Sequence, residues 1–460
     1  MGLILAAAPI QAREPDPTKY LIDTVPSQWQ YVTDIPSVSP ENDKWWKNFN
    51  DVILDSLIET AITNNFNVSI AAHRMEIARQ TLKQARSQYF PSLNFQGGWS
   101  KSRTSGAMTT DNGQAVNSSY FSLGLDMSWQ IDLFGKITAQ SRNREALYKA
   151  SRAELDGMLV SVAAETATYY INLRVLQAQL QVATQHLESQ ARIVKITEVR
   201  YDTGLASKLD VAQARALYLS TQASIPSLEN AINSAISSIA LMLGVYPGQI
   251  VDMLSREADL PDYHQPVALG IPMDLLRRRP DIIEAEYNVA AYAAALGIAK
   301  KDFLPTLTLD GSIGTSAHNF DHLFKKNSFS YTIAPTLSWT LFEGLSRKYA
   351  LASAREQMQS AIDSYNLTVM TAVREADVAL SDYHFTLQTI DLDKQVYDES
   401  TTAFELSMDQ YKNGLQSLTP VVDAQMNMLT YSNSLVTQKG NALLDLIDLY
   451  KALGGGWSDM

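Results

Sequence analysis

The feature that most constrains the fold of this 460-residue chain is an internal duplication. The segment Tyr201–Ser207 (YDTGLAS) recurs as Tyr411–Ser417 (YKNGLQS), 210 residues further along the chain. The dipeptide Ser128-Trp129 recurs at the same spacing. Because self-similarity of this kind marks repeated structural units, we predict two repeats with one plan, at 57–243 and 275–451.

The rest of the chain flanks or joins these repeats. The apolar segment Met1–Ala12 ends in small residues and is typical of an export signal that lacks its basic n-region, with cleavage near Ala12. We interpret it as a signal-peptide remnant. The remaining ranges are predicted as an extended N-terminal arm in an equatorial region, an equatorial linker and a C-terminal tail: 13–56, 244–274 and 452–460.

Each repeat contains two segments in which apolar and polar side chains alternate strictly, the pattern of β-strands. The most regular segment has apolar side chains along the whole of one face: Phe121, Leu123, Leu125, Met127, Trp129, Ile131 and Leu133. We predict strands at 92–100, 119–133, 306–315 and 329–342, with a long polar loop inside each pair. A transmembrane β-strand needs about 9–11 residues, so strands of this kind can cross a bilayer.

Each repeat also contains a very long helical segment, predicted at 136–203 and 345–413. The second has no Gly or Pro at all, and the first has only Gly157. Apolar residues recur at alternating spacings of four and three, which is the pattern of a coiled-coil seam. The remaining faces are polar, so we expect these helices to lie in water. A shorter return helix follows each of them, at 208–243 and 418–451.

Four strands in one chain cannot close around a lumen, since even small barrels need about eight. Strand edges that lie in lipid must nevertheless be paired, because no water is present to satisfy their amides. We therefore expect several copies to contribute four strands each, with polar side chains lining a wet lumen and apolar side chains facing lipid. The alternative is a soluble β-sandwich with a coiled-coil appendage.

Composition excludes several classes of function. The net charge of −12 argues against nucleic acid as a partner, because binding phosphate backbones needs a basic face. The absence of Cys removes disulfides, thiolate metal sites and Cys nucleophiles. His318 and His322 have metal-ligand spacing but no evident third ligand, and no group of acid, base and nucleophile stands out. We therefore predict no cofactor, no metal site and no enzymatic activity.

Several motifs together resemble one known family, the outer-membrane efflux proteins or TolC-like channels, and most closely their OprM-type drug-efflux branch. The motifs cover nearly the whole chain: Phe90–Leu93 (FPSL), Trp129–Gly135 (WQIDLFG), the duplicated Tyr-x-x-Gly-Leu, Leu275–Glu286 (LLRRRPDIIEAE) and Leu449–Trp457 (LYKALGGGW). Members of that branch usually begin their mature chain with a lipidated Cys. This sequence has no Cys, so the resemblance does not predict a lipid anchor here.

The resemblance implies a mixed α/β membrane fold and a homotrimer. Twelve strands, four from each chain, would form a transmembrane β-barrel in the outer membrane of a Gram-negative bacterium. A long coiled-coil α-helical barrel would continue it through the periplasm, with a small equatorial mixed region. The implied function is the passive exit duct of a tripartite multidrug efflux pump, which docks onto a periplasmic adaptor protein and an inner-membrane transporter.

The turns between the long helices and their return helices are the predicted functional site, at Tyr201, Gly204, Tyr411 and Gly414. Each glycine suits the end of a helix, where a left-handed backbone is favoured. Both segments can equally be read as turns with no further role.

The resemblance implies that Asp423 lines the periplasmic constriction and that Asp210 belongs to the links that hold it closed. Thr419, one turn before Asp423, would lie near the same gate. In a trimer an inward Asp becomes a ring of three carboxylates, which favours cations. The alternative is that an Asp at a helix start only complements the helix dipole.

The basic run Arg277–Arg279, just before Pro280, is expected to form a solvated or inter-subunit face. Within the same architecture, a duct for metal-ion efflux or protein secretion is the first alternative function. A soluble coiled-coil scaffold is the second, and an enzyme comes last.

Overall fold

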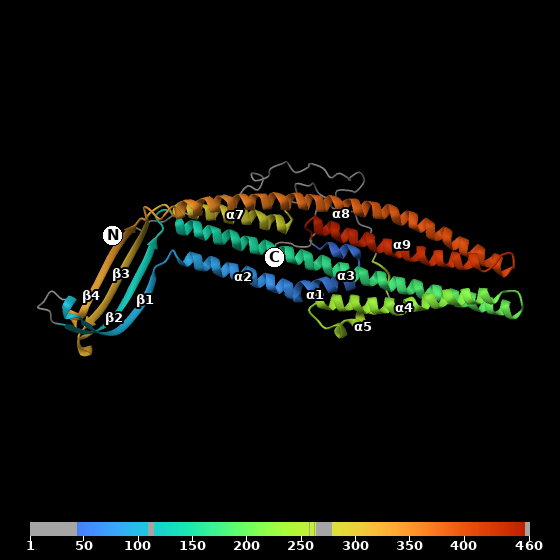
Figure 1. Ribbon diagram of the computed structural model, residues 1–460, viewed down its shortest axis with the longest axis horizontal. Helices are drawn as coiled ribbons and strands as arrows, with labels where there is room; N and C mark the ends of the chain where they lie inside the picture. The colour runs from blue at the N-terminus through green and yellow to red at the C-terminus, as the bar shows by residue number, and fades with distance from the viewer. Residues whose placement is uncertain (1–43, 109–114, 257, 262, 264–277, 456–460) are drawn as a thin grey trace. The chain divides into compact units, whose positions relative to one another are not determined.

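The computed structural model describes residues 44–108, 115–256, 258–261, 263 and 278–455 (Figure 1). The predicted signal-peptide remnant, most of the arm and much of the equatorial linker lie outside these residues. The described residues divide into two compact units. The strand unit comprises 74–108, 115–151 and 285–365, and the helical unit comprises the rest. Each unit contains segments from both predicted repeats. The two compact units therefore do not correspond to the two halves of the sequence.

The strand unit is built on a four-stranded antiparallel sheet with the strand order β1-β2-β3-β4 (Figure 1). Its strands are β1 (Ser92–Thr104), β2 (Val116–Ile131), β3 (Thr306–Ala317) and β4 (Phe329–Ser338). Because the strands follow each other in chain order, β1 and β4 form the two edges. In the described residues neither edge has a partner strand.

The prediction that the fourth strand extends to residue 342 is wrong, because β4 ends at Ser338. Ser338 pairs with Thr306, the first residue of β3. The residue before Thr306 is Pro305, which has no N–H to extend the ladder. The first and third strands, by contrast, run further than predicted, to Thr104 and Ala317.

The two faces of the sheet differ as the alternation predicts. The register aligns Phe95 with Leu125, Leu125 with Ile313 and Ile313 with Tyr331 across all four strands. The neighbouring row, one residue further along, is polar: Asn94, Asp126, Ser312 and Thr332. We call these the apolar face and the polar face. Phe95 and Tyr331 are each 71% exposed, so none of the described residues covers the apolar face at the two edge strands.

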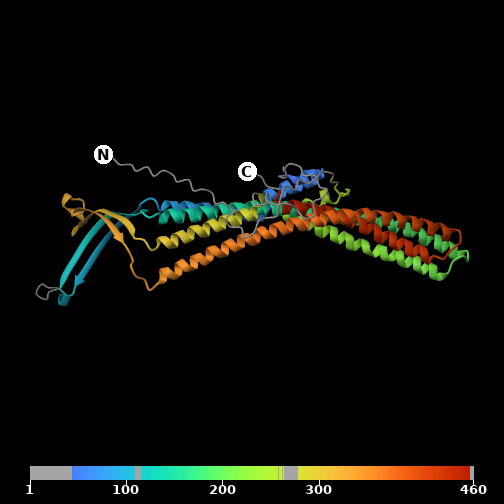
Figure 2. The same cartoon turned by 90° about the horizontal axis from the view of Figure 1, so that it is seen from above.

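The long helices form as predicted, within one residue at each end. They are α3 (Lys136–Asp202) and α8 (Ser346–Lys412), and their return helices are α4 (Lys208–Met242) and α9 (Thr419–Ala452). The other α-helices of the described residues are α1 (Val52–Asn64), α2 (Phe66–Ser87), α5 (Val251–Leu254) and α7 (Pro280–Lys301). In the helical unit, α3 and α4 run side by side to one turn and α8 and α9 to another, as both views show (Figures 1 and 2). None of the described helices combines the length and apolarity needed to span a membrane.

Candidate functional site at the helical turns

Both long helices of the helical unit end in the same hydrogen-bonded turn. At the end of α3, the Leu205 amide donates to Arg200 O at 2.7 Å, and the Gly204 amide donates to Tyr201 O at 2.9 Å. At the end of α8 the equivalent donors are Leu415 and Gly414, with distances of 2.9 and 3.0 Å. This is the Schellman arrangement, which satisfies the last carbonyls of a helix.

The Schellman turn requires a left-handed residue after the helix. Gly204 has φ +76° and Gly414 has φ +73°, so the left-handed backbone expected at both glycines is observed. The two duplicated tyrosines, in contrast, differ in environment. Tyr201 is 44% exposed, whereas Tyr411 is buried. The duplicated sequence therefore gives equivalent backbones but not equivalent side-chain packing.

Arg200 links the two turns. Its guanidinium donates to Lys412 O at 2.9 Å, at the C-terminal end of α8, and lies 4.8 Å from the centre of the Tyr411 ring. A cation at this position complements the negative end of the α8 dipole, and the ring adds a cation–π contact. Sequence reasoning missed Arg200, because the residue 210 positions later is Gln410 and the duplication does not mark it.

An apolar cluster lies directly behind the turns and joins all four helices. Its buried members are Ile193, Ala214, Met408, Tyr411, Leu418 and Val421. They come from α3, α4, α8 and α9, so burial of their side chains stabilises both hairpins at once. The turns are thus ordered by the packing of the bundle, although they themselves are exposed.

The two predicted gate aspartates have different local roles. Asp210 forms a capping box with Ser207: the Ser207 amide donates to Asp210 Oδ2 at 2.8 Å, and the Asp210 amide donates to Ser207 Oγ at 3.1 Å. This closes the first turn of α4 and engages the Asp210 carboxylate.

Asp423 lies beyond the first turn of α9, which has no side-chain cap at Leu418. Its carboxylate is exposed and makes no hydrogen bond or ion pair with another described residue. Thr419 lies one turn earlier on the same face and is also exposed. Capping of a helix therefore accounts for the position of Asp210, whereas Asp423 caps nothing at the start of α9. No contact among the described residues brings the two aspartates together.

Polar side chains are buried between α3 and α9, further from the turns than the apolar cluster. The amide of Gln425 lies 2.9 Å from His186 Nδ1, and both residues are buried. Gln190, also buried, lies one turn further along α3. Burial lowers the pKa of His186, since the interior disfavours the charged ring. Buried polar groups in a coiled coil disfavour other registers of the helices.

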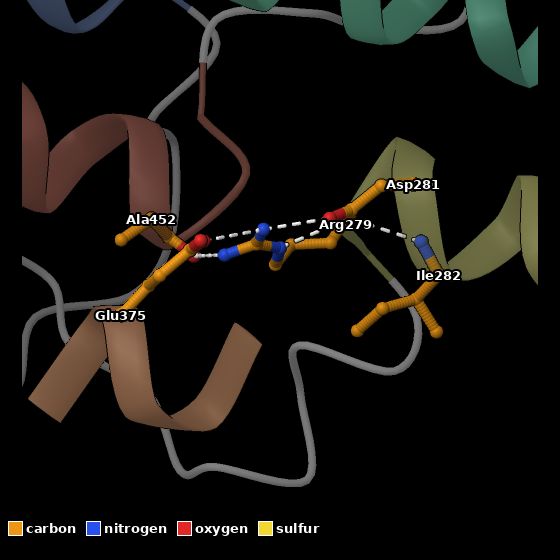
Figure 3. A network of polar contacts seen from close by, with 5 residues as sticks. All are labelled: Arg279, Asp281, Ile282, Glu375 and Ala452. Atoms are coloured by element: carbon orange, nitrogen blue, oxygen red, sulfur yellow. Dashed lines mark hydrogen bonds and ion pairs between the residues drawn. The ribbon is translucent and has the colours of Figure 1, made fainter. Parts of the chain in front are cut away.

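A second polar network fixes the opposite end of α9 (Figure 3). The Arg279 guanidinium binds Asp281 through two atoms, at 3.0 and 2.6 Å, and donates to Glu375 Oε2 at 2.9 Å. It also donates to Ala452 O at 3.1 Å, at the C-terminal end of α9. One side chain therefore joins the start of α7 to α8 and α9.

The expectation that Arg279 belongs to a solvated or inter-subunit face is wrong. Its side chain is only 10% exposed and has partners within the chain. Burial alone would lower the pKa of Arg279, but hydrogen bonds and the charges of Asp281 and Glu375 outweigh it, so the pKa is raised. Arg277 lies outside the described residues. A triple-Arg run reads as surface in sequence, and only the fold shows which member turns inward.

Comparisons with known proteins agree with this geometry. The family described as "Outer membrane efflux protein" matches residues 57–245 and 271–455. The chain is 28% identical to the pyoverdine export outer membrane protein OpmQ of Pseudomonas aeruginosa, over 94% of this chain and 91% of that protein. It is 29% identical to the solvent efflux pump outer membrane protein SrpC of Pseudomonas putida, over 89% and 87%.

Solved structures show the same fold. The outer-membrane channel OprN superposes with a TM-score of 0.91 and 29% identity, covering 97% of this chain and 98% of that one. The outer membrane protein VceC of Vibrio cholerae superposes with a TM-score of 0.84 and 25% identity, covering 91% and 100%. The predicted fold class, membrane strands continued by long coiled-coil helices, is confirmed. The chain therefore belongs to the outer membrane efflux protein family, and it is an outer-membrane channel of a Gram-negative efflux system.

Proposed function

We propose that three copies of this chain assemble into one passive channel, the exit duct of a tripartite multidrug efflux pump. The observation that supports this most directly is the sheet, which among the described residues has two unpaired edges and an apolar face exposed at both edge strands. In lipid each edge must find a partner strand. A neighbouring copy supplies one, with β4 of one chain beside β1 of the next in antiparallel order, and three copies give twelve strands.

The mass of the detergent-solubilised particle tests this assembly. The protein component should have three times the 50.9 kDa mass of one chain, measured by light scattering with the detergent contribution subtracted. A folded particle with the mass of one or two chains would contradict the proposal.

The gate of this channel lies at the helical turns. Asp423 is exposed and has no capping role, so three copies place three carboxylates at one level of the tunnel. Such a ring favours cations and holds a high local field. Thr419 lies beside it, and Arg200 and the Asp210 capping box hold the turns on which it stands.

Single-channel recording in planar bilayers tests the ring. Asp423→Ala should weaken cation selectivity or raise conductance, whereas Asp398→Ala, which removes an exposed carboxylate elsewhere on α8, should change neither. If Asp423→Ala leaves both quantities at their wild-type values, Asp423 is not part of the gate.

The duct binds a periplasmic adaptor protein and an inner-membrane transporter, which supplies the energy and selects the cargo. The chain itself performs no catalytic step. Relatives are named for the efflux of toluene, solvents and antibiotics and for pyoverdine export, which favours small organic cargo over metal ions or proteins. Complementation of a deletion strain tests this choice, because only restored resistance to such compounds is consistent with it.

A further inference from the structure

The end of the sheet that lies away from the helices has a rim of aromatic side chains. The rings of Phe320 and Phe121 are 5.6 Å apart, and those of Phe324 and Phe320 are 6.3 Å apart. Trp99, on the neighbouring strand, lies 6.4 Å from Phe121. We call these four residues the aromatic rim. It forms where the apolar face of the sheet meets the loop 318–328.

This loop is held in place, so the exposure of its rings is a fixed property. Leu323 is only 1% exposed, and Ser328 Oγ donates to His322 O at 2.7 Å. Phe324 is nevertheless 74% exposed and Phe320 60%. Aromatic side chains exposed next to an apolar sheet face are typical of the headgroup level of a membrane.

Basic side chains lie just beyond the aromatic rim. Lys101 and Arg103 follow Trp99 at intervals of two residues in an unbroken ladder, so they share its face of the sheet. Lys325 and Lys326 directly follow Phe324 and are also exposed. We call these four residues the basic rim.

The charge of the basic rim is not neutralised within the described chain. None of its four members has an ion-pair partner among the described residues. Asp321 is the acidic residue among the described residues of this loop, and its carboxylate lies 3.4 Å from the ring of His322 and not beside a member of the basic rim. The whole chain has a net charge of −12, so two exposed pairs of cations at this end of the sheet do not follow from composition.

We propose that the aromatic and basic rims together bind phosphate-bearing lipid headgroups in the membrane leaflet at the loop end of the sheet. Lys and Arg side chains bind phosphate oxygens with strong charge-assisted hydrogen bonds. Their aliphatic stems lie along apolar surface while the charged ends reach the headgroups. Basic residues near an anionic membrane surface are attracted to it, and each of them adds to the binding. In an outer membrane, this leaflet presents the phosphates of lipid A.

The position of the basic pairs adds a detail that rests on the proposed trimer. Lys101 and Arg103 lie on β1, one edge of the sheet, and Lys325 and Lys326 lie at the short 3-10 turn before β4, the other edge. When β4 of one copy pairs with β1 of the next, both pairs flank the same seam. One bisphosphorylated lipid can then contact two copies, which gives three such sites in a trimer.

Native mass spectrometry of the detergent-solubilised full chain with added lipid A tests the proposal. The wild type should retain lipid A, with up to three molecules per trimer, and should retain the fully dephosphorylated lipid less well. The double variants K101Q/R103Q and K325Q/K326Q should each weaken retention about tenfold or more. The matched variant K195Q/K394Q, which removes two exposed lysines from the helical unit, should bind as the wild type does.

Equal retention of the two lipids by the wild type, or undiminished binding by both rim variants, would overturn the proposal. The same spectra report the mass of the protein, so loss of the trimer is distinguished from loss of lipid by an intact trimer. If a variant fails to assemble, the comparison of lipid A with the dephosphorylated lipid on the wild type still tests the proposal. Retention of lipid A should fall steeply as salt rises, and retention that ignores salt would exclude a charge-based site.

Discussion

At the scale of single residues, the helical unit depends on a few polar side chains that each join several helices. Arg279 is the clearest case, since it binds two carboxylates and the last carbonyl of α9. Gly454, with φ +72°, allows the chain after α9 to pass Arg279 closely, because a Cβ there would lie 3.1 Å from Arg279 Cα. Exposed ion pairs contribute little to stability, but a largely buried guanidinium with several partners contributes more.

We predict that Arg279→Gln destabilises the helical unit by about 2 kcal/mol, because hydrogen bonds to charged groups are lost and Glu375 loses its partner. Arg279→Lys should recover only part of this, since Lys cannot bind Asp281 through two atoms. Arg215→Gln removes the exposed pair with Glu198 and is the control. Chemical denaturation monitored by circular dichroism measures all three. Equal midpoints for Arg279→Gln and Arg215→Gln would show that Arg279 has no special role.

His186 predicts a pH dependence whose sign follows from its burial. The pKa of His186 is lowered in the folded state, so the unfolded chain binds more protons at mildly acidic pH. The stability contributed by neutral His186 is fully present above about pH 6.5 and is lost as pH falls from there through the folded-state pKa.

The matched variant for this prediction is His186→Gln, which cannot titrate but can still bind Gln425. Thermal melts at about pH 7.5 and pH 5.5 should show a larger drop for the wild type than for His186→Gln. If both proteins lose the same amount on acidification, His186 does not contribute to the acid sensitivity.

At the scale of elements, each long helix stops because one residue reverses the backbone while the bundle packs behind it. A Cβ at Gly204 would contact nothing within 4 Å, so only the positive φ excludes a side chain there. Each turn therefore depends on a left-handed residue in its own backbone and on the packing of the apolar cluster that includes Leu418 and Val421.

We predict that Gly204→Ala costs roughly 1 kcal/mol of stability, all of it from left-handed backbone strain. Gly248→Ala is the matched control, since Gly248 also has open space around it but no positive φ. Thermal unfolding should show a lower midpoint for Gly204→Ala than for Gly248→Ala. A midpoint for Gly204→Ala at or above the control would mean that the turn relaxes without strain.

At the scale of the whole molecule, the two unlike faces of the sheet favour a position in a membrane. Its apolar face is exposed on the edge strands β1 and β4 and half-buried to exposed on β2 and β3, and its polar face carries small and hydroxylated side chains with Asp126 and Asp310. A single chain of this kind would be poorly stable in water. Lipid on one face and a wet lumen on the other satisfy both faces.

Adjacent residues on β4 distinguish the two faces directly. Ile333 pairs with Gly311 on the apolar face, and Thr332 pairs with Ser312 on the polar face. We predict that Ile333→Lys costs about 2–4 kcal/mol in the membrane, whereas Thr332→Lys is tolerated because its charge reaches the lumen. Urea-induced unfolding of the protein in vesicles measures both. The reverse order of stability would assign lipid to the other face.

The sequence by itself determined the repeated plan, the four strands with their two faces and the lengths of the helices. Periodicity and the absence of Gly and Pro are local properties of the sequence. They specify a helix or strand wherever one face of that element is apolar and the other is polar. It also marked Gly204 and Gly414, because a left-handed residue is a local requirement. Only the tertiary structure decided that Arg200 spans two turns, that Arg279 turns inward and that β4 ends at Ser338 opposite the start of β3. These three depend on residues distant in the chain that meet only when the helices and strands have packed, and no pattern along the sequence encodes that meeting.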